Sequence, residues 1–185
     1  MTTALLIIDV QCAILAGLAP PERQPVIDLA LDDTVWRLQA LGRKAHAGGV
    51  PVVLVQHDGA AGHRLAVGSP GWALRPEIAA RGGDIVVRKR SCDAFFQTDL
   101  QDRLATLGID HLVIGGCMTQ FCVDTTVRRA VSLGYDVSLI ADGHTTADQG
   151  DLGFAQIIAH HNTTLDGFDA GARSTRVLPA AALFL

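Results

Sequence analysis

The sequence of 185 residues has no large excess of charge of one sign. It carries 15 basic and 19 acidic side chains, a net charge of -4, and no long block of either sign. Proteins that bind nucleic acid or an anionic membrane surface electrostatically present a basic patch. We therefore expect neither nucleic acid nor membrane as a partner.

Long hydrophobic runs are also missing. The first ten residues, MTTALLIIDV, have no basic segment before their short apolar run, and Asp9 interrupts that run. A signal peptide needs the basic segment and a membrane-spanning helix needs about 20 apolar residues, so we expect neither here. No repeat, linker or low-complexity stretch divides the sequence, and its length suits one domain, 1–185, with a sizeable core.

Cysteine is scarce, with only Cys12, Cys92, Cys117 and Cys122 in the chain. In a chain of this length these four do not resemble a disulfide framework, so a cytoplasmic, reducing compartment is expected. Cys117 and Cys122 are not spaced as C-x-x-C, and a thioredoxin-type site is therefore not supported. A redox-sensor role for Cys122 with Cys117 or Cys92 is a separate alternative.

What the sequence does contain is an alternation of buried apolar runs with helical patterns, within a composition that is 49% hydrophobic. The runs predict strands at 4–10, 51–56, 85–87, 112–114, 135–140 and 175–178. The patterns between them predict helices at 27–47, 98–107 and 152–165, and another from about Thr119 to the glycine stop at Gly134. Strands that alternate with helices indicate an α/β fold with a doubly wound, mainly parallel sheet covered on both faces.

Three chemically active side chains each follow directly on a predicted strand: Asp9, Lys89 and Cys122. In parallel sheets, ligands bind at the carboxyl ends of the strands. If the first and fourth strands are neighbours, Asp9 and Cys122 meet at the switch point and the three residues share one pocket. The plainer interpretation is a small buried thiol beside a structural ion pair.

Together these residues suit nucleophilic catalysis. Cys122 falls in the first turn of a predicted helix, where unpaired N–H groups and the helix dipole favour a thiolate. A thiolate attacks a carbonyl carbon and leaves a thioester, with Asp9 as general base and then acid. Lys89, as a nearby cation, would keep the Cys122 thiolate and the Asp9 carboxylate in their working protonation states. The backbone N–H groups of Met118 and Cys122 would bind the oxyanion.

The segments LLIIDVQ, VVRKRSCDAF and VIGGCMTQFCVDTTVRRAVSLGYDV resemble those of the isochorismatase-like cysteine hydrolases. The third segment matches the family pattern G-x-x-T-x-x-C-V-x-x-T, and the resemblance covers nearly the whole chain. It implies that Asp9, Lys89 and Cys122 form a catalytic triad and that a cis peptide bond joins Cys117 to Met118. It also implies a Rossmann-like three-layer α/β/α sandwich with a six-stranded parallel sheet, and a homo-oligomer, dimeric or tetrameric.

Departures from the family pattern bear on the substrate. The chain resembles the nicotinamidase branch, but Val55 stands where that branch has a metal-binding aspartate two residues before His57. A remade site of His57, Asp58 and His63 is conceivable, but we expect no metal and no cofactor. Isochorismatases proper, which cleave a vinyl ether, lack the cysteine, so Cys122 argues against that reaction.

The favoured function is hydrolysis of the C–N bond of a small amide, carbamoyl or ureido compound, as in other members that this chain resembles. A metal-assisted nicotinamidase-like amidase and a non-catalytic small-molecule binder of the same fold are the alternatives. Candidate substrate-binding residues are Gln11, His57, Trp72 and Phe95, for which loop packing is the competing interpretation.

Overall fold

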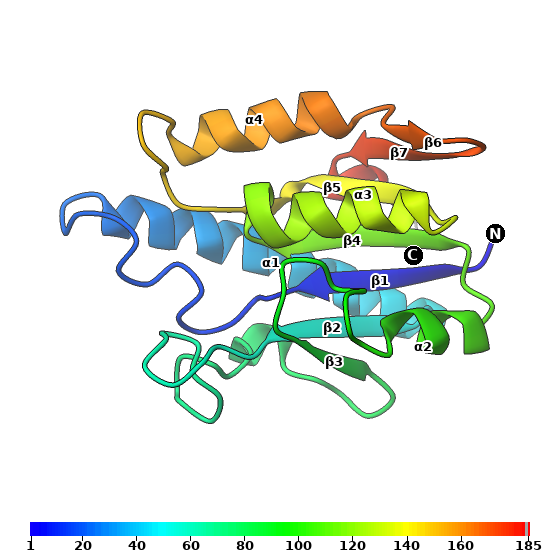
Figure 1. Ribbon diagram of the computed structural model, residues 1–185, viewed down its shortest axis with the longest axis horizontal. Coiled ribbons are helices and arrows are strands. Elements are labelled where there is room, and N and C mark those ends of the chain that lie inside the picture. The colour runs from blue at the N-terminus through cyan, green and yellow to red at the C-terminus, as the bar shows by residue number, and fades with distance from the viewer. Residues whose placement is uncertain (184) are drawn as a thin grey trace.

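The computed structural model describes residues 1–183 and 185, and its centre is a sheet with the strand order β3-β2-β1-β4-β5-β7-β6 (Figure 1). The strands are β1 (Thr3–Ile8), β2 (Val52–His57), β3 (Ile85–Lys89), β4 (His111–Cys117), β5 (Asp136–Thr145), β6 (Asp169–Ala170) and β7 (Arg173–Leu178). The chain first runs outward from β1 to β3 and then resumes on the other side of β1 with β4. This reversal confirms the doubly wound topology.

Six of the strands pair in parallel, as predicted, and a seventh was not foreseen. The extra strand, β6, is two residues long and pairs antiparallel with β7. Gly171, at φ 69°, lies in the turn between them. A segment this short leaves no periodicity in the sequence, which is why the pattern predicted six strands.

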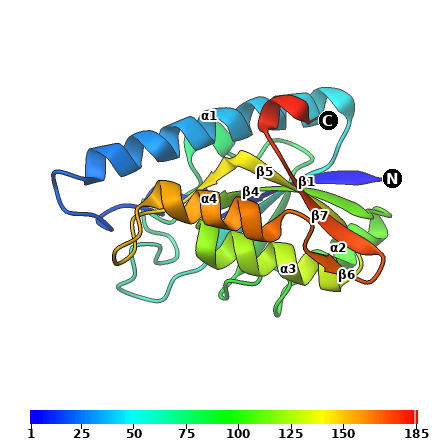
Figure 2. The ribbon, with the colours of Figure 1, turned by 90° about the horizontal axis from the view of Figure 1, so that it is seen from above.

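Helices cover both faces of the sheet, giving three layers. The α-helices are α1 (Gln24–Gly48), α2 (Leu100–Thr106), α3 (Asp124–Ser132) and α4 (Phe154–Leu165), with short helical turns η1 (Pro76–Ile78), η2 (Thr119–Val123) and η3 (Ala180–Ala182). Figure 2 shows α1 and the C-terminal turn on one side of the sheet and α3 and α4 on the other. Within the described residues, no helix is both long and apolar enough to cross a membrane.

The two faces of the sheet explain why the strand sequences lack alternation. On β1, Leu6 and Ile8 belong to the core that packs with α2 and α3, whereas Leu5 and Ile7 belong to the core under α1. Since successive side chains of a strand point to opposite faces, a strand covered on both sides must be apolar throughout. Full burial of each such side chain contributes about 1.5–3 kcal/mol.

The segment after β4 differs from the prediction. The helix expected from Thr119 begins as a π-helical turn, η2, and becomes α-helical only at Asp124. Just before it, Gly116 has φ 128°, and a Cβ there would collide with the backbone of Ile8 on β1. This glycine therefore lets the end of β4 lie directly against β1 and sets the position of the turn that follows.

Candidate active site

The three strand-end residues come together at one edge of the sheet, as the topology predicted. Asp9 directly follows β1, Lys89 is the last residue of β3, and Cys122 lies in η2 after β4. Asp9 has φ 51°, a left-handed conformation that costs a residue with a side chain about 1–2 kcal/mol. Functional sites are where such conformations concentrate, because the surrounding structure holds them in place.

Lys89 contacts both of the other two residues, Asp9 and Cys122. Its Nζ atom lies 2.6 Å from Asp9 Oδ2, 2.8 Å from the Ser91 carbonyl oxygen and 3.2 Å from Cys122 Sγ. These three neighbours match the three N–H donors of an ammonium group. The side chains of Lys89 and Asp9 are both 0% exposed, so the pair is fully removed from water.

Burial gives Asp9 an unusual affinity for a proton. It raises the pKa of the Asp9 carboxyl well above its ordinary value, although the charge of Lys89 pulls the other way. Oδ1 of the same carboxyl is buried and accepts no hydrogen bond from the described residues. Burial also lowers the pKa of Lys89, but the charges of Asp9 and Cys122 outweigh that effect and raise it overall. Asp9 is therefore suited to accept a proton while Lys89 keeps its own.

Cys122 differs from the sequence-based expectation of a resting thiolate. A hydrogen bond with the Cys92 thiol and burial raise the pKa of Cys122 above its ordinary value, and the charge of Lys89 only partly opposes them. The expectation of a resting thiolate considered the start of the helix alone, whereas the contact with Cys92 and burial act in the opposite direction. The thiol thus keeps its proton at rest and has an adjacent carboxyl that can take it.

A buried hydrogen-bond chain supports the turn that carries Cys122. Thr119, the first residue of η2, contacts Nδ1 of His144 at 3.0 Å, and Nε2 of that ring contacts Asn162 Oδ1 at 2.9 Å. The Asn162 side chain also donates to the carbonyl of Ala141. Burial lowers the pKa of His144 to about 4, so the ring is neutral near pH 7. The chain connects η2, β5 and α4.

The other sequence candidates divide into one residue that faces the site and others that support it. His57, the last residue of β2, is half-buried, and its Nδ1 atom has no hydrogen-bond partner among the described residues. Burial and the charge of Lys89 lower the pKa of His57 to about 4. Its ring is therefore neutral near pH 7 and free to hydrogen-bond a substrate.

Gln11 is fully buried, and its amide is occupied by backbone groups. It donates to the carbonyls of His57 and Trp72 at 3.0 and 2.7 Å and accepts from the His57 N–H at 3.0 Å. These bonds hold the end of β2 against the loop 59–76. The geometry thus gives Gln11 a positioning role rather than the substrate contact that we expected.

Trp72 belongs to a cluster with Asp58 and Arg88, two residues that line the same cavity as Lys89. Its Nε1 donates to Asp58 Oδ1 at 2.9 Å, and the Arg88 guanidinium lies over its ring at 4.9 Å from the centroid. Arg88 also pairs with Asp58 at 2.9 Å. Phe95 is likewise a structural residue: it is 8% exposed, belongs to the core and stacks on Tyr135.

The same cluster bears on the metal alternative. Asp58 is engaged by Trp72 and Arg88, and His63 Nδ1 accepts the N–H of Leu65. In the part of the chain that the structure describes, no three His, Cys, Asp or Glu side chains are grouped as metal ligands. As arranged, these residues do not fit a metal ion, and we derive no step through one.

Two cavities open beside the cluster and show residues that sequence reasoning missed. One, of about 310 Å³, includes Lys89, Phe96 and Gln97 in its lining, and the other, of about 590 Å³, includes His57. Both are lined by Arg90, which makes no ion pair within the described residues. Phe96 is 53% exposed, unlike its neighbour Phe95. The alternation in exposure between these two residues is not visible in the sequence.

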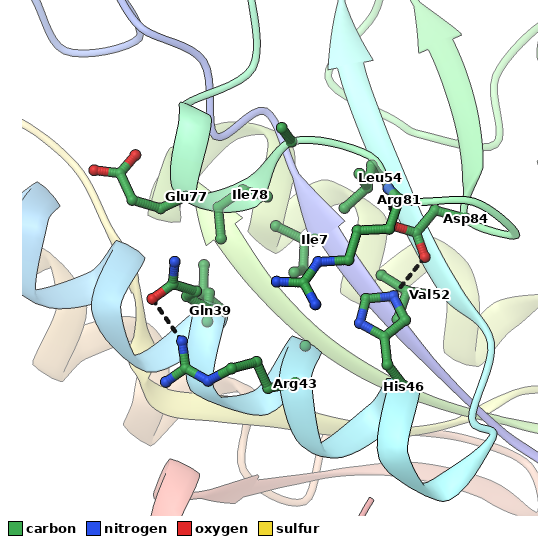
Figure 3. A pocket seen from close by; sticks show the side chains of 13 residues that line it. Ile7, Gln39, Arg43, His46, Val52, Leu54, Glu77, Ile78, Arg81 and Asp84 are labelled. Atoms are coloured by element: carbon green, nitrogen blue, oxygen red, sulfur yellow. Dashed lines mark hydrogen bonds and ion pairs between the residues drawn. The ribbon is translucent and has the colours of Figure 1, made fainter.

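A further hollow lies far from this chemistry, between α1, β2 and the segment around η1 (Figure 3). Its rim carries the His46–Asp84 pair and the hydrogen bond from Arg43 to Gln39, both drawn in Figure 3. Its volume is only about 20 Å³, room for a single water molecule. This hollow is therefore too small for a substrate, unlike the two cavities beside Lys89.

Comparison with known proteins shows what the chain is similar to. Residues 3–171 match the model of the isochorismatase domain family. A streptothricin hydrolase of Streptomyces noursei is 37% identical over 146 residues, which cover 78% of this chain and 50% of that protein. The ureidoacrylate amidohydrolase RutB of Stutzerimonas stutzeri is 37% identical over 102 residues, 55% of this chain and 40% of that protein. The chain thus spans about half the length of the streptothricin hydrolase it matches.

A solved structure extends the match to nearly the whole fold. The isochorismatase from Pseudomonas putida KT2440 superposes with a TM-score of 0.84 at 29% identity, covering 98% of this chain and 89% of that one. The peptide bond between Cys117 and Met118 is cis, as the resemblance implied. With the family model covering most of its length, this chain belongs to the isochorismatase family.

Proposed function

We propose that the protein is a cysteine-dependent hydrolase that cleaves a C–N bond of a small amide, carbamoyl or ureido compound through a thioester intermediate. The observation that carries this proposal is the Lys89 ammonium within 3.2 Å of Cys122 Sγ and 2.6 Å of Asp9 Oδ2. A nucleophile, a proton acceptor and a fixed cation are thereby within reach of one reacting carbonyl group.

The reaction begins when the Asp9 carboxylate takes the proton of the Cys122 thiol and the sulfur attacks the carbonyl carbon. Protonated Asp9 then gives its proton to the leaving nitrogen, the C–N bond breaks, and the acyl group stays on Cys122 as a thioester. Asp9 next takes a proton from water, whose oxygen attacks the thioester, and the sulfur leaves and regains a proton. Lys89 remains charged throughout and stabilises each anionic state.

The oxyanion that forms at each attack needs hydrogen-bond donors. We assign this role to the backbone N–H groups of Met118, the residue before the π-helical turn, and of Cys122, within it. Arg64 adds positive charge nearby: its Nη2 lies 3.9 Å from Met118 Sδ, and burial lowers the pKa of its guanidinium.

The experiment is a hydrolysis assay on a panel of small amides, carbamoyl compounds and ureido acids, both neutral and anionic because Arg90 lines the cavities. We expect one class to be turned over and Cys122→Ala to abolish that turnover while the circular dichroism spectrum is unchanged. Cys12→Ser is the matched control, since Cys12 is another free cysteine that is exposed.

Two results would overturn the proposal. If Cys122→Ala retained full activity, the thioester route would be excluded. If the wild-type protein bound members of the panel but hydrolysed none, the non-catalytic binder would take its place. Activity that disappears with a chelator and returns with zinc, iron or manganese would support the metal-assisted alternative instead.

We also propose a homo-oligomer, a dimer or tetramer, in a reducing cytoplasmic compartment. Phe121 and Leu152 are 39% and 54% exposed, on η2 and just before α4, and apolar surface of this kind is commonly covered by a second copy. All four cysteines are free thiols. Light scattering at several concentrations measures the assembly, and a monomer at every concentration would exclude it.

A further inference from the structure

Lys89 contacts both the Cys122 thiol and the backbone beside a second free thiol, Cys92, which has no part in the proposed reaction. Lys89 Nζ donates to Cys122 Sγ at 3.2 Å and to the carbonyl of Ser91 at 2.8 Å. Ser91 is the residue before Cys92. The buried lysine therefore ties the segment with Cys92 directly to the nucleophile.

A second anchor holds the same segment on the helix of Cys122. Thr126, one helical turn after Cys122, donates its hydroxyl to the carbonyl of Cys92 at 3.3 Å and accepts the N–H of Ala94 at 3.1 Å. The thiols of Cys92 and Cys122 lie close enough for each to shift the pKa of the other. The backbone of Cys92 is thus positioned by contacts around the reacting sulfur.

The two thiols differ in the way that disulfide chemistry requires. Cys92 is exposed, whereas Cys122 is partly buried. The hydrogen bond with Cys122 and the charge of Lys89 lower the pKa of Cys92 to about 6, against the opposing effect of burial. Cys92 is therefore largely a thiolate at neutral pH, and an exposed thiolate is the form that oxidants attack.

The remaining cysteines are placed differently. Cys117 is fully buried and packs in the core under α1, while Cys122 packs against the core on the opposite face of the sheet. Burial raises the pKa of Cys117 above its ordinary value. Cys12 is exposed and directs its thiol to the carbonyl of Leu74 at 3.7 Å. Of the two partners considered for Cys122 from the sequence, the structure retains Cys92.

We propose that Cys92 is an oxidation-sensing thiol that forms a reversible disulfide with Cys122 and thereby switches the hydrolase off. The proposal rests on the proposed function in one respect: the loss of activity follows because Cys122 is the nucleophile. Formation of the disulfide itself depends only on the two thiols and on an oxidant of the peroxide class.

The chemistry balances with one peroxide for each disulfide. The Cys92 thiolate attacks one oxygen of hydrogen peroxide, the O–O bond breaks, and a sulfenic acid forms while the released hydroxide takes a proton to become water. The Cys122 sulfur then attacks the Cys92 sulfur, and the S–O bond breaks. The hydroxide takes the proton of the Cys122 thiol by way of Asp9 and leaves as a second water. A cellular thiol reverses the bond by exchange.

The experiment exposes wild-type protein, Cys92→Ser and Cys12→Ser to hydrogen peroxide and divides each sample. One portion is assayed for activity before and after dithiothreitol. In the other, the remaining thiols are blocked with N-ethylmaleimide before intact mass and non-reducing peptide mapping. In wild type and Cys12→Ser we expect a loss of two hydrogens, about 2 Da, in a peptide pair that joins Cys92 to Cys122. Activity should fall in proportion to that disulfide and return with dithiothreitol.

Cys92→Ser should form no such bond and should instead add oxygen at Cys122, with a loss of activity that dithiothreitol does not fully reverse. The inference is overturned if wild type forms no Cys92–Cys122 disulfide, or if Cys92→Ser loses and regains activity as wild type does. Because the mass measurement needs no substrate, its failure is distinct from failure of the proposed hydrolysis. If the Cys92–Cys122 disulfide forms but no substrate is hydrolysed, the redox pair is confirmed and only its role in switching activity is excluded.

Discussion

Replacing Lys89 with methionine removes the charge at the centre of the site and keeps an unbranched side chain of similar length. Lys89 Nζ lies 2.6 Å from Asp9 Oδ2, and neither side chain is exposed. With an effective dielectric constant of about 20, Coulomb's law gives an attraction of about 6 kcal/mol at this distance. Desolvation offsets part of it, and breaking a buried pair by removing one partner typically costs about 3–5 kcal/mol.

We therefore expect Lys89→Met to lower the free energy of unfolding by about 3–5 kcal/mol at pH 7 and to abolish turnover. The deficit should depend on pH. Burial already raises the pKa of Asp9 above 3.8, and loss of the cation raises it further. At pH values between the pKa of Asp9 in the unfolded variant and its higher pKa in the folded variant, Asp9 is protonated only in the folded state. The free energy of unfolding of the variant therefore falls as pH rises through this range. The deficit relative to wild type should shrink as the pH is lowered from 7 to about 5.

Urea unfolding followed by circular dichroism at pH 7 and pH 5 measures both quantities. Asp9→Asn and the double variant Asp9→Asn with Lys89→Met complete a double-mutant cycle. The double variant should be more stable than the two single losses added together, because it leaves no buried charge unpaired. A single variant within about 0.5 kcal/mol of wild type, or a deficit independent of pH, would refute the reasoning. If Lys89→Met does not fold, the double variant compared with Asp9→Asn still gives the effect of removing Lys89 when its partner carries no charge.

Two further substitutions test the residues that support the turn carrying Cys122. In the folded protein the pKa of His144 is lowered to about 4, so the unfolded chain takes up a proton at this residue first as pH falls below 6.5. Up to about 3 kcal/mol of the free energy of unfolding should be lost between pH 6.5 and 4. Denaturant titrations should show a flatter dependence of this free energy on pH for His144→Gln than for wild type, and parallel dependences would contradict the reasoning. Gly116→Ala should cost about 3 kcal/mol or more in thermal unfolding, because its Cβ would meet the Ile8 backbone at a positive φ. Gly42→Ala, in α1 with open space around its Cβ, is the control and should be neutral or stabilising, and equal effects at the two positions would be inconsistent with the close approach.

Much of the site could be predicted because its residues follow strands that are readable as apolar runs. A strand buried on both faces must be apolar throughout, so the polar residue that ends it is conspicuous, as Asp9 and Lys89 are. The alternation of strands and helices then requires these ends to share one edge of the sheet. Pocket residues were predicted less well, since Gln11 and Phe95 lie beside the site yet face the backbone and the core.

The sequence by itself determined the parallel α/β architecture, the family and the edge of the sheet where Asp9, Lys89 and Cys122 meet, because these depend on local periodicity and on residue type at strand ends. Tertiary structure alone decided which charges meet and what they do to one another. The pKa of Cys122 rises rather than falls because the contact with Cys92 and burial outweigh the charge of Lys89, which lowers it. Such effects depend on distances of a few ångströms between segments far apart in the chain, and no local pattern encodes them.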